Sequence, residues 1–412
     1  MKAYLRTFGC RANQYDTEAV RAMIEASGGT IVATPEEADV ALFNSCAVTA
    51  AAEADLRQEI RRAARMRSEG RSVVMGCASA RDDGTIAALP GVSDVIGGAD
   101  LEALAIALGI DPSFALARNG TQTGSRALLR IQDGCDEHCT FCATTLARGG
   151  NRSRGAEEIV REAKALAVEH PEIVITGIHI GTYGADCGSS LGALMERLVN
   201  EVPRVRYRLT SVEASEVDAR LEEVLVSDPL RVAPHLHAPL QSGSDRVLKR
   251  MGRHWYTRSS YADAASRISA RREVFALGAD IITGFPGETD EDHRETVSLV
   301  NELPFTYLHV FPYSARPGTA ALRMDGDVPA TVSRERAAEL RAIGEAKAAA
   351  HRARRVGGQA DVVVVGDGAR REGLTEDYLT VSLADPSMPR RSRFAGTLGV
   401  SSVSGIFASR VC

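Results

Sequence analysis

The chain has 412 residues, of which 44% are hydrophobic and 25% are charged, so two or three domains of ordinary globular composition are expected. This composition excludes a disordered chain, and eight cysteines are too few for a disulfide scaffold of this length. The net charge is −5, but residues 331–412 carry +4 and residues 1–330 carry −9. A basic end is compatible with a polyanionic partner, although a solvated helix surface explains the charge equally well.

The start of the chain, "MKAYLRTFGC", lacks the apolar core of a signal peptide. No stretch approaches the roughly 18 apolar residues that a membrane span requires. A cytoplasmic protein without a membrane partner is therefore expected. In a reducing compartment, clustered cysteines are more often metal ligands or catalytic groups than disulfides.

Residues 1–110 alternate short apolar runs with helical patterns, which predicts a small parallel α/β domain. The predicted strands are "KAYLRTF", "DVALFNS", "SVVMG" and "DVIGG", and the predicted helices cover residues 13–26 and 49–66. The first three strands end on Cys10, Cys46 and Cys77. Ligands of parallel sheets collect at the carboxyl ends of strands, so these cysteines are expected to share one site. The alternative is three buried cysteines that act as small hydrophobic residues.

A second alternation follows a turn-rich linker at residues 109–125 and predicts a partial (β/α)6 barrel over residues 125–355. Its predicted strands are residues 127–132, 172–177, 204–211, 235–240, 279–284 and 306–311. A helix over residues 332–355 then leads into a Val/Ser/Gly-rich tail. Residues 356–412 predict a small antiparallel β barrel.

The segment "GCDEHCTFC" places Cys135, Cys139 and Cys142 within one loop after the first barrel strand. A structural zinc site needs four ligands, and the nearby candidate His138 is adjacent to Cys139, which makes zinc the poorer interpretation. A disulfide between two of these cysteines would leave the third without a partner. A [4Fe–4S] cluster held by three cysteines keeps one iron open for a substrate that brings its own ligands.

This Cys-x3-Cys-x2-Cys loop, with Phe141 before the last cysteine, resembles the radical S-adenosylmethionine superfamily. The segments "HLHAPLQSGSDRVLKRMGR", "ADIITGFPGETDED" and "FPYSARPGTAA" resemble its methylthiotransferase family. The N-terminal cysteines fit the same family, and the tail looks like a TRAM RNA-binding module. The resemblance covers essentially the whole chain.

The resemblance implies two [4Fe–4S] clusters, one on Cys135, Cys139 and Cys142 and an auxiliary one on Cys10, Cys46 and Cys77. It implies that S-adenosylmethionine is cleaved to a radical and that a methylthio group is added to C2 of an adenine. An unactivated C–H bond needs radical chemistry of this kind. "GCRANQYDTEA" and "NSCAVTAAAEADLRQEIRRA" are most similar to the branch that modifies N6-threonylcarbamoyladenosine at position 37 of tRNA, in the anticodon loop. The isopentenyladenosine branch and the branch that modifies an aspartate of a ribosomal protein are alternatives.

One departure from the family pattern follows the third cysteine, where Thr145 and Leu146 replace a Pro-Tyr pair and Gly150 replaces an arginine. The resemblance also implies an electron donor such as flavodoxin or ferredoxin. Strand ends offer contacts to S-adenosylmethionine, unless these residues only form local turns; the expected residues are Thr176, Gly177, Ser211, Glu213, Gln241, Thr283 and Gly284. RNA contacts are expected at Arg148, Arg152, Arg154, Arg390, Arg391 and Arg393. A non-catalytic RNA-binding iron–sulfur protein is the alternative of another class.

Overall fold

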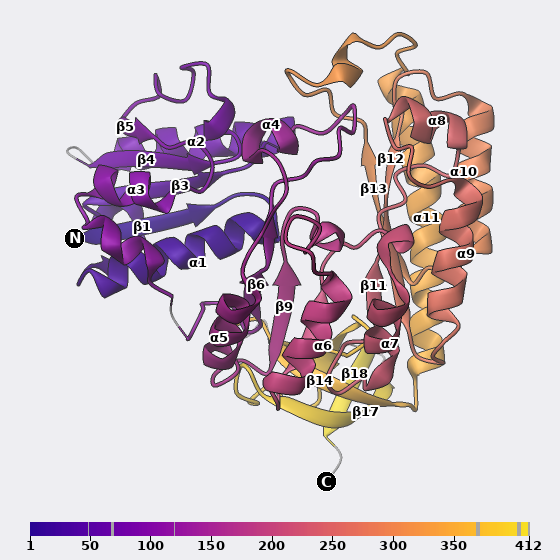
Figure 1. Cartoon of the computed structure of the whole chain (residues 1–412). Helices are drawn as coiled ribbons and strands as arrows, with labels where there is room; N and C mark the ends of the chain where they lie inside the picture. Colours follow the sequence, from indigo (N-terminus) through magenta and orange to yellow (C-terminus); the bar gives the residue numbers. More distant parts are fainter. Residues whose placement is uncertain (48, 67–69, 119, 368–370, 402–404, 411–412) are drawn as a thin grey trace.

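The computed structural model describes residues 1–47, 49–66, 70–118, 120–367, 371–401 and 405–410. It has three parts, and the expected fold is confirmed: an N-terminal α/β domain, a partial barrel and a small C-terminal barrel (Figure 1). No helix in the described residues is long and apolar enough to cross a membrane.

The N-terminal domain is built on a parallel five-stranded sheet of order β2-β1-β3-β4-β5. In β3, Val40 and Leu42 face one hydrophobic cluster with α1 and α3, whereas Ala41 and Phe43 face another with α2, as the period of two in a strand requires. The short edge strand β2 was not predicted. The elements are β1 Lys2–Thr7, α1 Arg11–Ala26, β2 Thr30–Ile31, β3 Val40–Ser45, α2 Ala50–Met66, β4 Arg71–Gly76, β5 Val92–Val95 and α3 Leu101–Leu108.

The central barrel contains all six predicted strands, arranged as two parallel three-stranded sheets, β10-β9-β6 and β11-β12-β13. Single bridges between Tyr207 and Val232 and between Ser211 and His237 join β10 to the β11 side. The strands are β6 Ala127–Arg130, β9 Glu172–Thr176, β10 Arg206–Leu209, β11 His235–His237, β12 Ala276–Thr283 and β13 Tyr307–Pro312. A short antiparallel pair, β7 Gln132–Asp133 with β8 Arg152–Ser153, was not predicted.

Helices cover the outer face of the barrel, and its core is the largest hydrophobic cluster of the described residues. These helices are α5 Ala156–Leu166, α6 Leu191–Glu201, α7 Ala219–Ser227, α8 Asp245–Arg250, α9 Arg258–Ser269, α10 Asp290–Glu302 and α11 Ala330–Arg355. The short helix α4 Thr144–Arg148 lies instead beside the N-terminal domain (Figure 1). The linker contains a short 3-10 helix, Pro112–Leu116. Further along the linker, Gln122 donates its backbone N–H to Nε2 of His170, a contact of 3.0 Å that fixes the linker to the barrel.

The C-terminal part is a closed barrel of order β14-β15-β16-β18-β17, in which β16 and β18 are parallel and the other pairs antiparallel. It lies at the amino-terminal ends of the central strands (Figure 1). There Arg206 and Arg208 are fully buried against Glu172 of β9, and they also bond to Asp361 and the Thr375 carbonyl. The strands are β14 Gln359–Val365, β15 Glu372–Leu374, β16 Thr380–Leu383, β17 Arg393–Ser401 and β18 Gly405–Arg410.

Candidate functional site

The three N-terminal cysteines lie together at the carboxyl edge of the sheet. Cys46 directly follows β3 and Cys77 directly follows β4, while Cys10 precedes α1. A Cβ atom at Gly9 would lie 2.5 Å from Sγ of Cys46, so only glycine permits this approach of the two loops. Cys46 and Cys77 are buried and Cys10 is exposed. Cys10 and Cys46 lie close enough to Cys77 to act electrostatically on its thiol, and we call the three residues the N-terminal trio.

A buried arginine from the central barrel donates a hydrogen bond to the N-terminal trio. Arg148 of α4 donates from Nε to Sγ of Cys77 at 3.2 Å, and its Nη2 lies 2.7 Å from both Asp16 Oδ2 and Asn13 Oδ1. Burial raises the pKa of the Cys77 thiol to about 11, and the Arg148 guanidinium opposes that rise. Arg148 is 5% exposed and places its positive charge against the Cys77 sulfur. The expected RNA contact of this residue stays a prediction.

The second group, the barrel trio, consists of Cys135, Cys139 and Cys142 between β7 and α4. The loop is held by backbone bonds from Cys135 N to Gly149 O and from Cys142 N to Cys139 O, both 3.0 Å. All three sulfur-bearing residues line one cavity of about 180 Å³. His138, the alternative zinc ligand, is exposed and does not line this cavity. Three soft sulfur donors around one space suit an iron–sulfur cluster.

The barrel trio also has a buried arginine. Arg253 donates from Nη1 to Sγ of Cys139 at 3.3 Å and pairs with Glu213. Burial raises the pKa of Cys139 to about 12, and Arg253 opposes that rise. Sequence reasoning gave Arg253 no role, because nothing in its spacing connects it with a loop 114 residues earlier.

A histidine completes the surroundings of the barrel trio. His179 Nδ1 lies 3.4 Å from Sγ of Cys135, and its Nε2 lies 2.7 Å from Glu216. Burial alone would lower the pKa of His179, but the contacts with Cys135 and Glu216 outweigh it and raise this pKa to about 10. His179 and Glu216 were not predicted, since a single histidine after a strand is not a specific signal.

Five of the seven expected S-adenosylmethionine contacts fall into two groups. Ser211, Glu213 and Gln241 line the cavity of the barrel trio, and Gln241 has a φ of 64°, a strained value that is frequent at functional sites. Thr283 and Gly284 line neither this cavity nor the larger one described next. They contact α11 and a neighbouring turn instead: the Thr283 hydroxyl donates to Ser333 O, and Gly284 N donates to Glu288. The structure therefore does not bring these two residues to the site.

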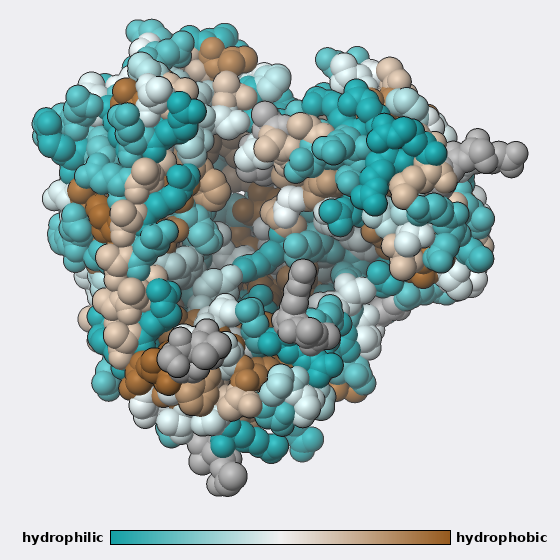
Figure 2. Space-filling model, turned by 180° about the vertical axis from the view of Figure 1, so that it is seen from behind, coloured by the Kyte–Doolittle hydropathy of each residue, from teal (hydrophilic) through white to brown (hydrophobic). Residues whose placement is uncertain are grey.

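A larger cavity, of about 610 Å³, lies between the two trios. Cys10 and Arg11 line one side, and it shares Thr144, Ile178 and Ser211 with the cavity of the barrel trio. The predicted residues Thr176 and Gly177 also line it. Its remaining walls come from β11, β12 and β13 and from Tyr378 of the C-terminal barrel. Seen from behind, the molecule is hollowed where the three parts meet (Figure 2). We call this space the central cavity.

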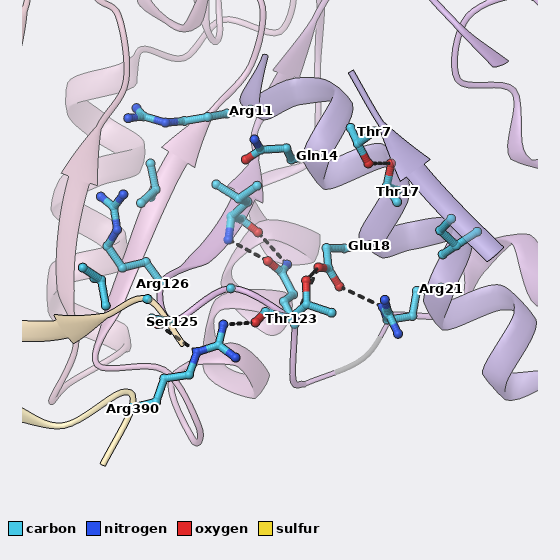
Figure 3. A pocket seen from close by; sticks show the side chains of 17 residues that line it. Thr7, Arg11, Gln14, Thr17, Glu18, Arg21, Thr123, Ser125, Arg126 and Arg390 are labelled. Atoms are coloured by element: carbon cyan, nitrogen blue, oxygen red, sulfur yellow. Dashed lines mark hydrogen bonds and ion pairs between the residues drawn. The ribbon is translucent and has the colours of Figure 1, made fainter. Parts of the chain in front are cut away.

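The other arginines that were expected to bind RNA have protein partners. Arg154 pairs with Glu162 at 2.7 Å and Arg152 is exposed. Arg393 binds Asp361, and Arg391 donates to the Gln122 carbonyl. Arg390 donates to Ser125 and Thr123, at a cavity of about 410 Å³ between α1, the linker and the C-terminal barrel (Figure 3). The contacts of Arg390 and Arg391 fix the C-terminal barrel to the linker, and RNA binding by these residues stays a prediction.

Two family models match the chain. The Uncharacterized protein family UPF0004 matches residues 2–98, which include the N-terminal trio, and the Radical SAM superfamily matches residues 129–300, which include the barrel trio. The fold of a radical S-adenosylmethionine methyltransferase, TsrM, from Kitasatospora setae is similar, with a TM-score of 0.59 and 15% identity over 78% of this chain and 76% of that chain.

Curated relatives match nearly the whole chain. Threonylcarbamoyladenosine tRNA methylthiotransferase MtaB of Bacillus subtilis (strain 168) is 38% identical over 82% of this chain and 79% of the relative. The protein of the same name from Aquifex aeolicus (strain VF5) is 32% identical over 92% of this chain and 96% of the relative. A tRNA-2-methylthio-N(6)-dimethylallyladenosine synthase of Sorangium cellulosum (strain So ce56) is 35% identical over 88% of this chain and 81% of the relative.

Proposed function

We propose that this chain, which belongs to the MtaB branch of the radical S-adenosylmethionine methylthiotransferase family, adds a methylthio group to C2 of N6-threonylcarbamoyladenosine at position 37 of tRNA. The reaction replaces the C2 hydrogen of the adenine by a methylthio group. It needs a sulfur donor on one side of the base and a source of radicals on the other.

The central cavity is the observation that carries this proposal. Cys10 of the N-terminal trio lies on one wall, and Thr144, Ile178 and Ser211 connect the space to the cavity of the barrel trio. A base bound here can therefore approach both groups of cysteines without moving between two sites. This arrangement supports a transfer in which one trio acts on the C–H bond and the other provides the sulfur.

Two iron–sulfur clusters fit the donor sets of the two trios. Each trio offers three cysteine sulfurs, and each has one buried guanidinium within 3.3 Å of a sulfur, which favours the thiolate form that metal binding requires. When bound, a cluster at the barrel trio supplies the electron that cleaves S-adenosylmethionine to a radical. Ser211, Glu213 and Gln241 would hold the cosubstrate beside this trio, and Thr176 and Gly177 would line its path toward the base.

The character of the central cavity supports the substrate of the MtaB branch over isopentenyladenosine. Its walls carry Arg11, His237, Asp280 and His309, which suit a polar, charged substituent rather than an isopentenyl chain. The tRNA would enter by its anticodon loop, with phosphate contacts from the exposed Arg152 and the basic C-terminal end. A tRNA substrate suits a cytoplasmic protein, and a flavodoxin or ferredoxin would supply the electron.

The test uses anaerobically reconstituted protein, a reductant, S-adenosylmethionine and two anticodon stem-loops. One carries N6-threonylcarbamoyladenosine at position 37 and the other isopentenyladenosine. Mass spectrometry of the nucleosides should find the methylthio product from the first stem-loop and little from the second. Preference for the second would assign the chain to the other substrate, and absence of both 5′-deoxyadenosine and product would favour a non-catalytic RNA-binding protein.

A further inference from the structure

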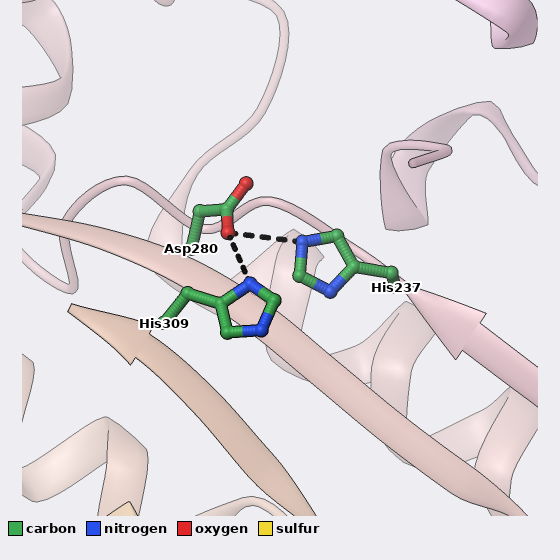
Figure 4. A group of neighbouring side chains, drawn as sticks. All are labelled: His237, Asp280 and His309. Carbon is green, nitrogen blue, oxygen red and sulfur yellow. Dashed lines mark hydrogen bonds and ion pairs between the residues drawn. The ribbon is translucent and has the colours of Figure 1, made fainter. Parts of the chain in front are cut away.

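A continuous chain of hydrogen bonds runs along one wall of the central cavity. The Tyr307 hydroxyl lies 2.8 Å from His235 Nε2 and 3.0 Å from His237 Nδ1. His237 Nε2 lies 3.0 Å from Asp280 Oδ1, and the same oxygen lies 3.2 Å from His309 Nδ1 (Figure 4). The chain begins at a buried ring, His235, and ends at His309, whose side chain is 51% exposed. None of these side chains lines the cavity of the barrel trio.

Asp280 fixes the position of the His309 imidazole. Burial would raise the pKa of Asp280, but the hydrogen bonds from His237 and His309 outweigh it and lower this pKa, so the carboxylate is ionised and accepts from both rings. A ring nitrogen that donates to a carboxylate has its tautomer and orientation fixed. Nδ1 of His309 is therefore engaged, and among the described residues Nε2 of His309 has no hydrogen-bond partner.

Arg11 lies near the buried end of this chain, beyond the Tyr378 ring that packs on His235 and Tyr307, and carries an unbalanced positive charge. It directly follows Cys10, lines the central cavity and donates from Nη2 to the Tyr378 hydroxyl at 3.0 Å. Within the described part of the chain it has no carboxylate partner, whereas Arg148 pairs with two carboxylates and Arg253 with one. A half-buried guanidinium without a counter-ion is suited to bind an anion from the ligand.

We propose that Arg11 binds the carboxylate, and His309 the hydroxyl group, of the threonyl substituent on the adenine. This inference rests on the proposed function and assigns the groups that select its substrate. C2 and the N6 substituent flank N1 on the same edge of adenine, so a base that presents C2 to the sulfur near Cys10 also brings its substituent next to Arg11. His309, held by Asp280, can then accept from the threonyl hydroxyl through Nε2.

The test compares three stem-loops that differ only in the substituent at position 37: threonylcarbamoyl, its methyl ester, and glycylcarbamoyl, which lacks the hydroxyethyl group. Each of four variants, Arg11→Gln, Arg11→Lys, His309→Leu and Arg6→Gln, is assayed with all three stem-loops. Arg6 is an exposed arginine of the same domain that lines neither cavity, so it is the matched control. The measured quantity is the ratio of kcat/KM between substrates within one variant, in which differences in folding or cluster loading cancel.

The wild-type protein should prefer the free acid over the ester, and threonyl over glycyl, by about tenfold or more each. Arg11→Gln should lose the first preference and keep the second, and His309→Leu should do the reverse. Arg11→Lys should keep part of the first preference, and Arg6→Gln should keep both.

Three outcomes would overturn the proposal. If the wild-type protein shows both preferences and Arg11→Gln and His309→Leu also retain both, other residues select the substrate and the proposed function stands. If the preferences need added Zn²⁺, then His237, Asp280 and His309, which lie close enough to share an ion, hold a cation instead. If the wild-type protein modifies none of the stem-loops, the proposed function fails and this inference fails with it.

Discussion

The two cysteine trios differ in origin but share one electrostatic arrangement. The barrel trio comes from one loop of eight residues, whereas the N-terminal trio is assembled from the ends of three strands. Each has a buried arginine that donates to one sulfur, at 3.3 Å for Arg253 and 3.2 Å for Arg148. Arg253 belongs to the same part of the chain as its trio, but Arg148 reaches into the N-terminal domain from the barrel.

The N-terminal trio depends on another domain for its arginine, whereas the barrel trio does not. The barrel trio and Arg253 both belong to the central barrel, so this contact needs no other domain. The N-terminal trio receives the guanidinium of Arg148 from the barrel, and the carboxylate of Asp16 holds this contact between the domains by pairing with Arg148 and, at 2.5 Å, with Arg130. We infer that the sulfur site is completed only in the assembled molecule, next to the cavity where the substrate binds.

The largest effect is expected from Cys139→Ala. The two remaining thiols of the barrel trio cannot hold the cluster, so S-adenosylmethionine cleavage and methylthiolation should both fall to background. The iron content should fall from about eight per chain to about four, because the N-terminal trio is intact. Retained 5′-deoxyadenosine formation, measured by chromatography, would show that the barrel trio does not hold the catalytic cluster.

Arg148→Met tests the contact between the domains. It leaves the buried Asp16 with fewer partners, and removal of one member of a buried ion pair costs about 3 kcal/mol. Chemical denaturation should show this loss, and reconstituted protein should contain less iron at the N-terminal trio. The control is Arg152→Met on the same loop, whose exposed side chain should contribute less than about 1 kcal/mol. Equal losses in the two variants would contradict the role given to Arg148.

Gly9→Ala tests the close packing of the N-terminal trio. Gly9 has a φ of 93°, and a Cβ atom would collide with the Cys46 side chain, so we expect a loss of about 2 kcal/mol and of iron at this site. Gly28→Ala is the matched control, because Gly28 has a φ of 83° and no other atom lies within 4 Å of where its new methyl group would be. It should show about 1 kcal/mol of strain and full iron content. Normal iron content in Gly9→Ala would mean that the trio tolerates a wider spacing.

The smallest expected effect is a change in the pH dependence of stability through His170, which contacts the linker between the N-terminal domain and the barrel. Burial lowers the pKa of His170 to about 4, below the value near 6.5 of an unfolded chain. Between these values the unfolded chain binds a proton that the folded chain does not, so stability should fall as the pH drops from 6.5 to 4. The denaturant midpoint of the wild-type protein should therefore fall more steeply with acid than that of His170→Gln. Identical slopes would show that His170 does not contribute.

The sequence predicted the features that depend on local pattern. All six barrel strands, the strand ends that carry Cys10, Cys46 and Cys77, and the loop of the barrel trio follow from hydrophobic period and spacing. The two-residue strand β2 is too short to leave such a pattern. Thr283 and Gly284 stay predictions; Thr283 contacts α11, because a strand end can also face a helix.

Long-range electrostatics could not be read from the sequence. Arg148 looked like a surface arginine of a basic loop, yet it is buried because Asp16 and Cys77 lie opposite it, more than 70 residues away in sequence. Arg253 and His309 are likewise defined by partners from other strands and loops. The burial of Arg206 and Arg208 against the C-terminal barrel was equally hidden, since charged residues in a strand usually indicate an exposed face.

The variant Cys46→Ala tests most directly whether the two trios have separate roles, with the barrel trio cleaving S-adenosylmethionine and the N-terminal trio providing the sulfur. Both 5′-deoxyadenosine and methylthiolated nucleoside are quantified in one anaerobic reaction with the threonylcarbamoyl stem-loop. The barrel trio keeps its three sulfurs and Arg253, so S-adenosylmethionine cleavage should persist, while the damaged N-terminal trio should transfer no methylthio group. Normal methylthiolation by Cys46→Ala would contradict the account, because the sulfur would then reach the adenine without the N-terminal trio.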